Sequence, residues 1–194
     1  MELILASNSA RRRELMANCG YDFTVLPADA DESIEESDPA LLVRRLALIK
    51  ARAVYNSLDS ERRGNAVVVG ADTVVVLEGR IIGKPRDEAD AREILLAESG
   101  RLNTVYTGVA VVTPFGEQSG FDKALVHFSE LTEDEIASYI ATGEPMDKAG
   151  AYGIQGRFSM FVEGIEGSYF TVVGLPVHLL YQMLKTVGVM PRDF

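Results

Sequence analysis

The feature that most constrains the fold of this chain is the run from Ala66 to Leu77, in which polar side chains occur only at Asp72 and Thr73. Short, nearly continuous apolar runs are typical of strands at the centre of a sheet that is covered on both faces. Helical patterns lie on both sides of this run, and several neighbouring strand patterns are separated by short turns. We therefore predict an α/β protein with a mixed sheet rather than a purely parallel one.

The remaining elements are predicted from periodicity and from capping residues. Strands are expected at 2–6, 22–26, 81–82, 104–113, 118–129, 158–163 and 169–173. Helices are expected at 10–19 with Ser9 as cap, 39–57 with Pro39 at its start, 88–98 with Asp87 as cap, 132–143 with a Thr132/Glu135 capping box, and 176–187. No repeat, low-complexity tract or linker divides the chain, so we predict a single domain over 1–194.

Charge and composition exclude several classes of protein. The net charge is −10, whereas a nucleic-acid-binding protein needs a broad basic face. No apolar run is long enough to cross a bilayer, and the N-terminus lacks the basic start and apolar core of a signal peptide. Cys19 is the only cysteine, so we expect neither a disulfide nor a thiol metal site. We expect a cytoplasmic protein that binds neither nucleic acid nor membrane.

Three arginines, Arg11, Arg12 and Arg13, fall in the first turn of the helix that Ser9 is predicted to cap. Positive charges there oppose the helix dipole. A bound phosphate would explain them, because helix N-terminal amides, serine hydroxyls and guanidinium groups all suit phosphate. A solvated basic face explains the same residues, and helix geometry leaves both interpretations open. The chain has no Walker A pattern and no G-x-G-x-x-G, so the usual phosphate-loop families are not supported.

Two charged residues are predicted to be buried. Lys50 shares the apolar face of the helix at 39–57, and Asp72 interrupts the central strand. A buried charge needs a partner or a ligand. The alternatives to a functional site are a Lys50 side chain that reaches past the core to water and an Asp72 that pairs with an arginine or caps a turn. Glu32 lies in the acidic loop 29–38, and one or two such carboxylates suit Mg²⁺ together with water and phosphate oxygens.

Two loops carry further candidates. Lys84 follows a strand and precedes Pro85, and Gln155 lies in the glycine-rich stretch 147–156. Such a loop lets the backbone approach a flat ligand closely, and the amide of Gln155 could read a base edge through its donor and acceptor. Ordinary tight loops are the alternative. The segments 167–169 and 174–176 are interpreted as turns with structural roles.

Taken together, these segments resemble the Maf family of nucleotide pyrophosphatases over essentially the whole chain. The matching segments are 6–12, 31–32, 50–53, 70–73, 83–85, 147–156 and 173–176. The resemblance implies an elongated mixed β-sheet flanked by helices, in two lobes with a central cleft, as in inosine triphosphate pyrophosphatases. It also implies a homodimeric enzyme that uses Mg²⁺ or Mn²⁺ to cleave a nucleoside triphosphate between its α and β phosphates.

The resemblance also assigns roles to residues. Asp72 matches the family's catalytic acidic residue, a proton acceptor, and is expected to hold the metal with Glu32. The substrate-binding positions are Ser7, Arg11, Arg12, Lys50, Thr73, Lys84 and Gln155, of which Arg12, Thr73 and Gln155 are tied to substrate choice. The loop 151–156 is similar to that of the subgroup acting on dTTP and UTP rather than on 7-methyl-GTP. Ala10 stands where many relatives have proline, which suits a helix start but is not required there.

The expected role is therefore removal of dTTP, UTP and modified pyrimidine triphosphates from the nucleotide pool. One alternative is a nucleotide-sensing regulatory protein linked to septum formation and arrest of cell division. Another is a phosphatase acting on a different small phosphate ester. The complete set of carboxylates and cations favours an enzyme, because a sensor does not need an acid that activates a nucleophile.

Overall fold

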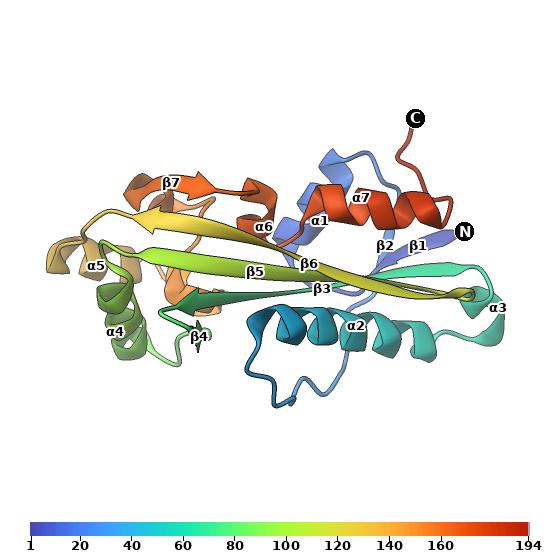
Figure 1. Cartoon of the computed structure of the whole chain (residues 1–194), viewed down its shortest axis with the longest axis horizontal. Coiled ribbons are helices and arrows are strands. Elements are labelled where there is room, and N and C mark those ends of the chain that lie inside the picture. The colour runs from blue at the N-terminus through green and yellow to red at the C-terminus, as the bar shows by residue number, and fades with distance from the viewer. Residues whose placement is uncertain (194) are drawn as a thin grey trace. The chain divides into compact units, whose positions relative to one another are not determined.

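The computed structural model describes residues 1–193 and confirms a mixed sheet flanked by helices (Figure 1). The strands are β1 (Glu2–Leu5), β2 (Thr24–Val25), β3 (Ala66–Leu77), β4 (Arg80–Ile82), β5 (Leu102–Thr113), β6 (Gly116–Phe128) and β7 (Val162–Glu166). Their order is β2-β1-β3-β5-β6-β7, with β4 paired to β3. Strand β1 is parallel to both β2 and β3. Strand β4 is antiparallel to β3, and β7 is antiparallel to β6. The predicted central strand is thus confirmed over its full length.

The helices are α1 (Ala10–Asn18), α2 (Pro39–Ser57), α3 (Ser60–Arg63), α4 (Glu88–Glu98), α5 (Glu133–Ile140), α6 (Tyr169–Val173) and α7 (Val177–Thr186), with 3₁₀ turns η1 (Glu144–Asp147), η2 (Ala149–Ala151) and η3 (Arg157–Phe161). Helices α1, α2, α4, α5 and α7 begin and end close to the predicted residues, whereas α3 and α6 were not predicted as helices. The side chain of Ser9 accepts from the Arg12 amide at 3.4 Å, and the Thr132/Glu135 capping box forms. Within the described chain, no helix is long and apolar enough to span a bilayer.

One predicted strand is wrong, and another begins later than predicted. The stretch 158–161 belongs to η3, so the strand begins only at Val162, and 169–173 forms the helix α6. The β-branched and aromatic residues of 169–173 favour a strand only as a weak preference, which tertiary context overrides. Gly167 and Gly174, with φ of 113° and 116°, bound this segment. The backbone therefore turns at both ends, and a short helix with Thr171 and Val173 buried fits between them.

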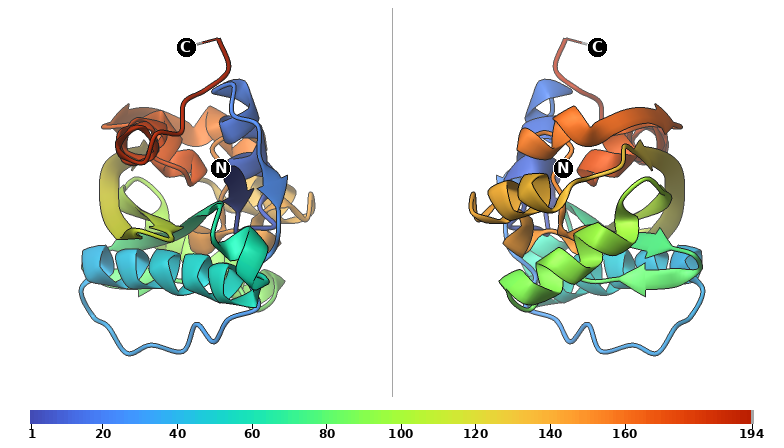
Figure 2. Two further views of the ribbon diagram at one scale, coloured as in Figure 1. Left: turned by 90° about the vertical axis from the view of Figure 1, so that its right-hand side faces the viewer. Right: turned by 90° about the vertical axis from the view of Figure 1, so that its left-hand side faces the viewer.

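Helices cover both faces of the part of the sheet that contains β1. Helix α2 lies along one face, and α1 and α7 lie on the other (Figures 1 and 2). The contact with α2 is close because two strand positions lack side chains. A Cβ on Gly70 would lie 2.1 Å from the carbonyl oxygen of Ala47, and a Cβ on Gly108 would lie 2.2 Å from that of Val43. The helix backbone therefore rests directly on β3 and β5.

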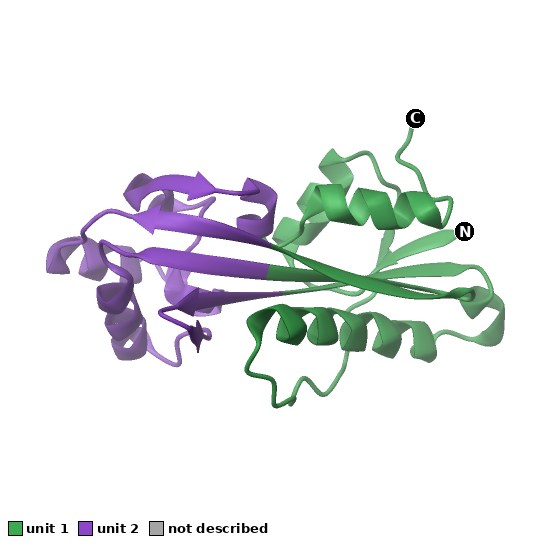
Figure 3. Cartoon of the chain, in the orientation of Figure 1, with its two compact units in different colours: residues 1–72, 107–122, 174–194 green, residues 73–106, 123–173 purple. Residues whose placement is uncertain are grey.

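Contacts divide the chain into two compact units (Figure 3). Unit 1 comprises Met1–Asp72, Thr107–Asp122 and Gly174–Phe194, and unit 2 comprises Thr73–Tyr106 and Lys123–Val173. Each unit has its own hydrophobic core. A single functional domain over 1–194 stays a prediction.

The core of unit 2 is aromatic. Phe158 is almost fully buried, and its ring centroid lies 4.8 to 5.4 Å from those of Phe128, Tyr139, Tyr152 and Phe161. Helices α4 and α5 pack together and against η1 and η2 in the same unit. This core fixes both flanks of the segment that carries Gln155.

A buried carboxyl group ends helix α4. Glu98 is completely inaccessible to solvent, and both of its carboxyl oxygens lack a hydrogen-bond partner among residues 1–193. It extends the buried face formed by Ala91 and Leu95. Because burial disfavours the charged form, it raises the pKa of Glu98 well above its usual value of 4.5.

We expect Glu98→Gln to stabilise the protein at neutral pH. The pKa of Glu98 is higher in the folded state than in the unfolded state. The protein is therefore most stable below the unfolded-state pKa, where Glu98 is neutral in both states, and it loses stability as pH rises toward the folded-state pKa. The neutral amide avoids that loss, so the free energy of unfolding at pH 7 should increase by about 1–3 kcal/mol. Urea unfolding of both proteins at pH 7 and near pH 4.5 measures this difference, which should disappear at the lower pH.

Glu93→Gln, on the exposed side of α4, is the matched control. A gain that is the same at both pH values would contradict the explanation.

Candidate active site

The candidate site is built where the parallel pairing of β1 with β3 ends, which is at the carboxyl end of β1 and in the middle of β3. Strands β1 and β3 pair with Leu5 opposite Val69, and the amide of Ala6 donates to the carbonyl of Val69 at 2.8 Å. Ser7 and Asp72 follow this last paired level, and both are largely buried. Loops at the carboxyl ends of parallel strands commonly form ligand sites in α/β proteins.

Ser7 and Arg12 are joined by a network of hydrogen bonds. The hydroxyl of Ser7 accepts from the Ser9 amide at 3.2 Å and from Nη1 of Arg12 at 3.3 Å. Nε of Arg12 donates to the carbonyl oxygen of Gly174 at 2.8 Å. The guanidinium group is therefore held in one orientation by groups from two distant parts of the chain.

Arg12 also lies in the electric field of two carboxylates. Burial lowers the pKa of its guanidinium group, whereas the charges of Asp72 and Glu32 act in the opposite direction. The neighbouring charge of Arg11 adds to the lowering. Arg11 and Arg12, both partly exposed at a helix start, concentrate positive charge in a protein with a net charge of −10.

Lys50 connects the two predicted metal-binding carboxylates. Its Nζ lies 2.6 Å from Oδ1 of Asp72 and 3.0 Å from Oε2 of Glu32. The side chains of Lys50 and Asp72 are 14% and 12% exposed, whereas that of Glu32 is 51% exposed. Asp72 faces α2 because Gly70, two residues earlier on β3, lies against that helix and strand side chains alternate between faces. Lys50, which is largely buried on an apolar helix face, is thus paired with two carboxylates, as a buried charge requires.

The carboxylate pair fits a metal ion that arrives with a phosphate ligand. Among the described residues, no group of three or more histidine, cysteine, aspartate or glutamate side chains is arranged to hold a metal. Mg²⁺ usually takes one or two carboxylates in such sites and completes its shell with water and substrate phosphate oxygens. Glu32 and Asp72 satisfy that smaller requirement. The metal itself stays a prediction.

The structure brings together five of the predicted residues, which all belong to unit 1: Ser7, Arg12, Glu32, Lys50 and Asp72. Arg11 is partly exposed on the same helix as Arg12. Thr73 follows Asp72 on β3 and points to the opposite face of the strand. Lys84 and Gln155 are exposed residues of unit 2, and their predicted roles stay predictions.

The loops that carry Lys84 and Gln155 are linked to each other within unit 2. The amide of Gly150 donates to the carbonyl oxygen of Gly83 at 3.1 Å. Gly150 has a φ of 72°, and a Cβ there would lie only 3.0 Å from Oε1 of Glu98. Both the backbone turn and the buried carboxyl group therefore require glycine at this position.

Comparison with known proteins places the chain in a family. A family model described as "Maf-like protein" matches residues 2–187. The chain belongs to the Maf family. It is 52% identical to a "dTTP/UTP pyrophosphatase" of Moorella thermoacetica over 97% of this chain and 96% of that protein. A protein of the same name from Agathobacter rectalis is 46% identical over 97% of this chain and 98% of that protein. Another from Symbiobacterium thermophilum is 48% identical over 96% of this chain and 94% of that protein.

A solved structure supports the fold assignment alone. The Ham1 protein of Staphylococcus aureus aligns with a TM-score of 0.56 at 13% identity, covering 96% of this Maf-family chain and all of that one. At this low identity the likeness concerns the arrangement of strands and helices, and it agrees with the expected α/β architecture.

Sequence reasoning missed one residue of the Maf-family site. Gly174 was interpreted as part of a turn, yet its carbonyl oxygen is the acceptor that orients Arg12. No local signal points to this contact, because the two residues are 162 positions apart. By contrast, Glu98 could have been recognised as buried, since its spacing from Ala91 and Leu95 follows one helix face.

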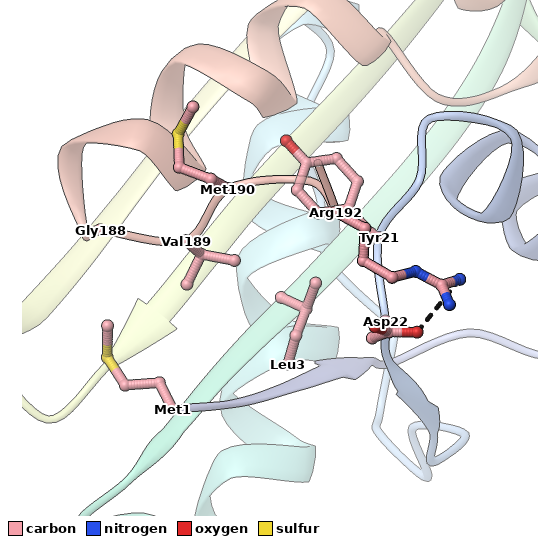
Figure 4. Close-up of a pocket in the computed structure, with 8 residues that line it drawn as sticks. All are labelled: Met1, Leu3, Tyr21, Asp22, Gly188, Val189, Met190 and Arg192. Carbon is pink, nitrogen blue, oxygen red and sulfur yellow. Dashed lines mark ion pairs between the residues drawn. The ribbon is translucent and has the colours of Figure 1, made fainter. Parts of the chain in front are cut away.

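A separate cavity of about 290 Å³ lies in unit 1 and contains none of the predicted site residues (Figure 4). It is lined by Met1, Leu3, Tyr21, Asp22, Gly188, Val189, Met190 and Arg192. An ion pair between Asp22 and Arg192, with N–O distance 3.2 Å, lies at one side of it. This cavity therefore differs in both residues and charge from the phosphate-binding candidate.

Proposed function

We propose that this Maf-family chain hydrolyses dTTP and UTP to the nucleoside monophosphate and pyrophosphate, and so removes these and modified pyrimidine triphosphates from the nucleotide pool. The observation that carries the proposal is the nearly buried Asp72 carboxylate, held 2.6 Å from the Lys50 ammonium group and close enough to Arg12 for their charges to interact. A proton acceptor next to concentrated positive charge suits attack on a phosphate group. The three relatives named dTTP/UTP pyrophosphatase support the choice of substrate.

The chemistry requires a water molecule to attack the α-phosphorus while the bond from that phosphorus to the bridging oxygen breaks. Asp72 accepts the proton of the attacking water, and pyrophosphate leaves with the bridging oxygen. Arg11, Arg12 and Lys50 stabilise the negative charge that develops on the phosphates, which is the dominant task in phosphoryl chemistry. Glu32 and Asp72 would hold a divalent cation, which supplies further charge neutralisation when bound.

Substrate selection is assigned to residues that the family resemblance ties to it. Arg12 is anchored to Gly174 through Nε, so its guanidinium group presents a fixed orientation to an anionic ligand. Gln155 carries both a donor and an acceptor and is exposed in its loop. We assign Gln155 and Thr73 to the pyrimidine, and Lys84 to the phosphates.

A panel of triphosphates tests this function. The protein is incubated with dTTP, UTP, CTP, dGTP and 7-methyl-GTP in the presence of Mg²⁺, and monophosphate and pyrophosphate are quantified separately. We expect rapid release of pyrophosphate from dTTP and UTP and its loss when EDTA removes the metal. Tight binding without turnover would support the sensor instead, and release of orthophosphate alone would support a phosphatase.

A further inference from the structure

The turn that carries Gln155 projects from a rigid base. The amide of Gly156 donates to the carbonyl oxygen of Gly153 at 3.0 Å, which closes a turn with Gln155 in its centre. Tyr152 before the turn and Phe158 after it are both buried in the aromatic core of unit 2. Gln155 itself is exposed. The side chain is therefore free to meet a ligand, whereas its flanks are fixed.

One phenol and one carboxylate hold the backbone on both sides of this turn. The amide of Gly153 donates to the hydroxyl oxygen of Tyr139 at 3.1 Å, and the amide of Arg157 donates to Oε2 of Glu144 at 3.1 Å. The Tyr139 hydroxyl in turn donates to Oε1 of Glu144 at 3.1 Å. Burial raises the pKa of Tyr139, so the hydroxyl keeps the proton that this last bond needs. The three bonds form one chain from the start of the turn to its end.

The glycines of the turn leave room for this carboxylate. A Cβ on Gly156 would lie 1.9 Å from Oε1 of Glu144, and a Cβ on Gly153 would lie 2.7 Å from Cε of Lys148. Nζ of Lys148 donates to the backbone carbonyl of Glu144 at 2.6 Å, which fixes the segment from which the carboxylate projects. The carboxylate thus occupies a space that any side chain at position 156 would fill.

We propose that Tyr139 and Glu144 are positioning residues for base selection, which hold the backbone of the 153–156 turn so that the Gln155 side chain reaches the base from one fixed position. This inference rests on the proposed function, in which Gln155 contacts the base. A carboxamide donates from one side and accepts on the other, so discrimination between bases depends on its orientation. If the turn shifts by a fraction of a hydrogen-bond length, the bonds between Gln155 and the correct base become weaker. The difference in binding between correct and incorrect bases then becomes smaller.

Tyr139→Phe tests the proposal with little change in packing. The ring that contacts Phe158, with centroids 5.1 Å apart, is retained, and only the hydroxyl is lost. We expect the KM for dTTP to rise about three- to tenfold with kcat within about twofold of wild type, because one or two hydrogen bonds that orient a ligand contact are lost. The ratio of kcat/KM for dTTP to that for dGTP should fall by a similar factor. Tyr169→Phe, an exposed tyrosine of the same unit, is the matched control.

Amide hydrogen exchange provides a readout that does not depend on turnover. Tyr139→Phe should speed the exchange of the Gly153 amide by about fivefold or more, and Glu144→Ala should do the same for Arg157, since each amide loses its acceptor. The Tyr169→Phe control should change neither rate. Unchanged exchange at both amides in the respective variants overturns the inference, whatever the enzyme's activity.

A double variant separates positioning from general destabilisation. In a Gln155→Ala background, Tyr139→Phe should leave the dTTP-to-dGTP ratio unchanged, because the group that the turn positions is already absent. A further fall in the dTTP-to-dGTP ratio in that background overturns the assignment to base selection. A wild-type ratio in Tyr139→Phe, despite faster exchange at Gly153, also overturns it. If wild-type protein releases no pyrophosphate from any triphosphate, the proposed function fails and base selection fails with it, while the exchange rates still decide whether the two side chains hold the turn.

Discussion

Replacement of Asp72 by asparagine is expected to reduce kcat by about 10²- to 10⁴-fold, because the group that accepts the proton of the attacking water is lost. The amide retains a carbonyl oxygen that can accept from Lys50, whose Nζ lies 2.6 Å from Oδ1 in the wild-type protein. The fold should therefore persist, and the KM for dTTP should change only a few-fold. Steady-state release of pyrophosphate, with circular dichroism as a check on folding, measures both effects.

The matched control for this variant is Asp22→Asn. Asp22 also belongs to unit 1, but its side chain is 71% exposed and its ion pair with Arg192 lies at the surface. We expect wild-type turnover from this control. Near-normal turnover by well-folded Asp72→Asn would show that another group accepts the proton and would remove the central assumption of the mechanism.

Replacement of Lys50 by methionine is expected to affect both stability and turnover. It leaves the Asp72 carboxylate, 12% exposed, without its closest cation, and removing one partner of a buried ion pair costs about 3–5 kcal/mol in the free energy of unfolding. Loss of one positive charge beside the phosphates should also lower kcat by about 10²-fold. Urea unfolding and steady-state kinetics measure the two effects separately.

Two further variants test whether the stability loss arises from the unpaired charge. Arg45→Met removes an exposed cation from the same helix, paired with Glu36, and should change the free energy of unfolding by less than about 0.5 kcal/mol. Adding Asp72→Asn to Lys50→Met should restore part of the lost stability, because no unpaired carboxylate then remains. A double variant no more stable than Lys50→Met would mean that the lysine stabilises the fold by packing rather than by charge.

Local sequence signals were sufficient for most of the fold. Helix α2 has the predicted bounds because Pro39 suits a helix start and the apolar spacing ends at Ser57. The prediction of strand β3 is clear because its apolar run is too long for a turn and is rich in valine, which is β-branched. The segment 169–173 could not be predicted in the same way. Its residue types favour a strand, and only packing and the glycines on either side make it a helix.

The candidate site shows the same limit. The helical pattern predicts that Lys50 is buried and the strand pattern predicts that Asp72 is buried, but neither pattern says which helix lies over which strand. The close contact of Gly70 with Ala47 determines that pairing, and it exists only in three dimensions. Resemblance to the Maf family supplied the missing information by placing both residues in one site. The roles of Tyr139 and Glu144 needed the structure, because their partners are backbone amides of another loop.

The hydrogen bond from Arg12 to Gly174 has a consequence for the order in which the protein is made. Arg12 is synthesised 162 residues before its acceptor. The strands β1 and β3 can pair as soon as residue 69 has emerged, but the bond from Nε of Arg12 can form only after Gly174 has emerged. A chain that has not yet reached Gly174 therefore contains the two carboxylates and the lysine of the candidate site, but it lacks the acceptor that orients Nε of Arg12.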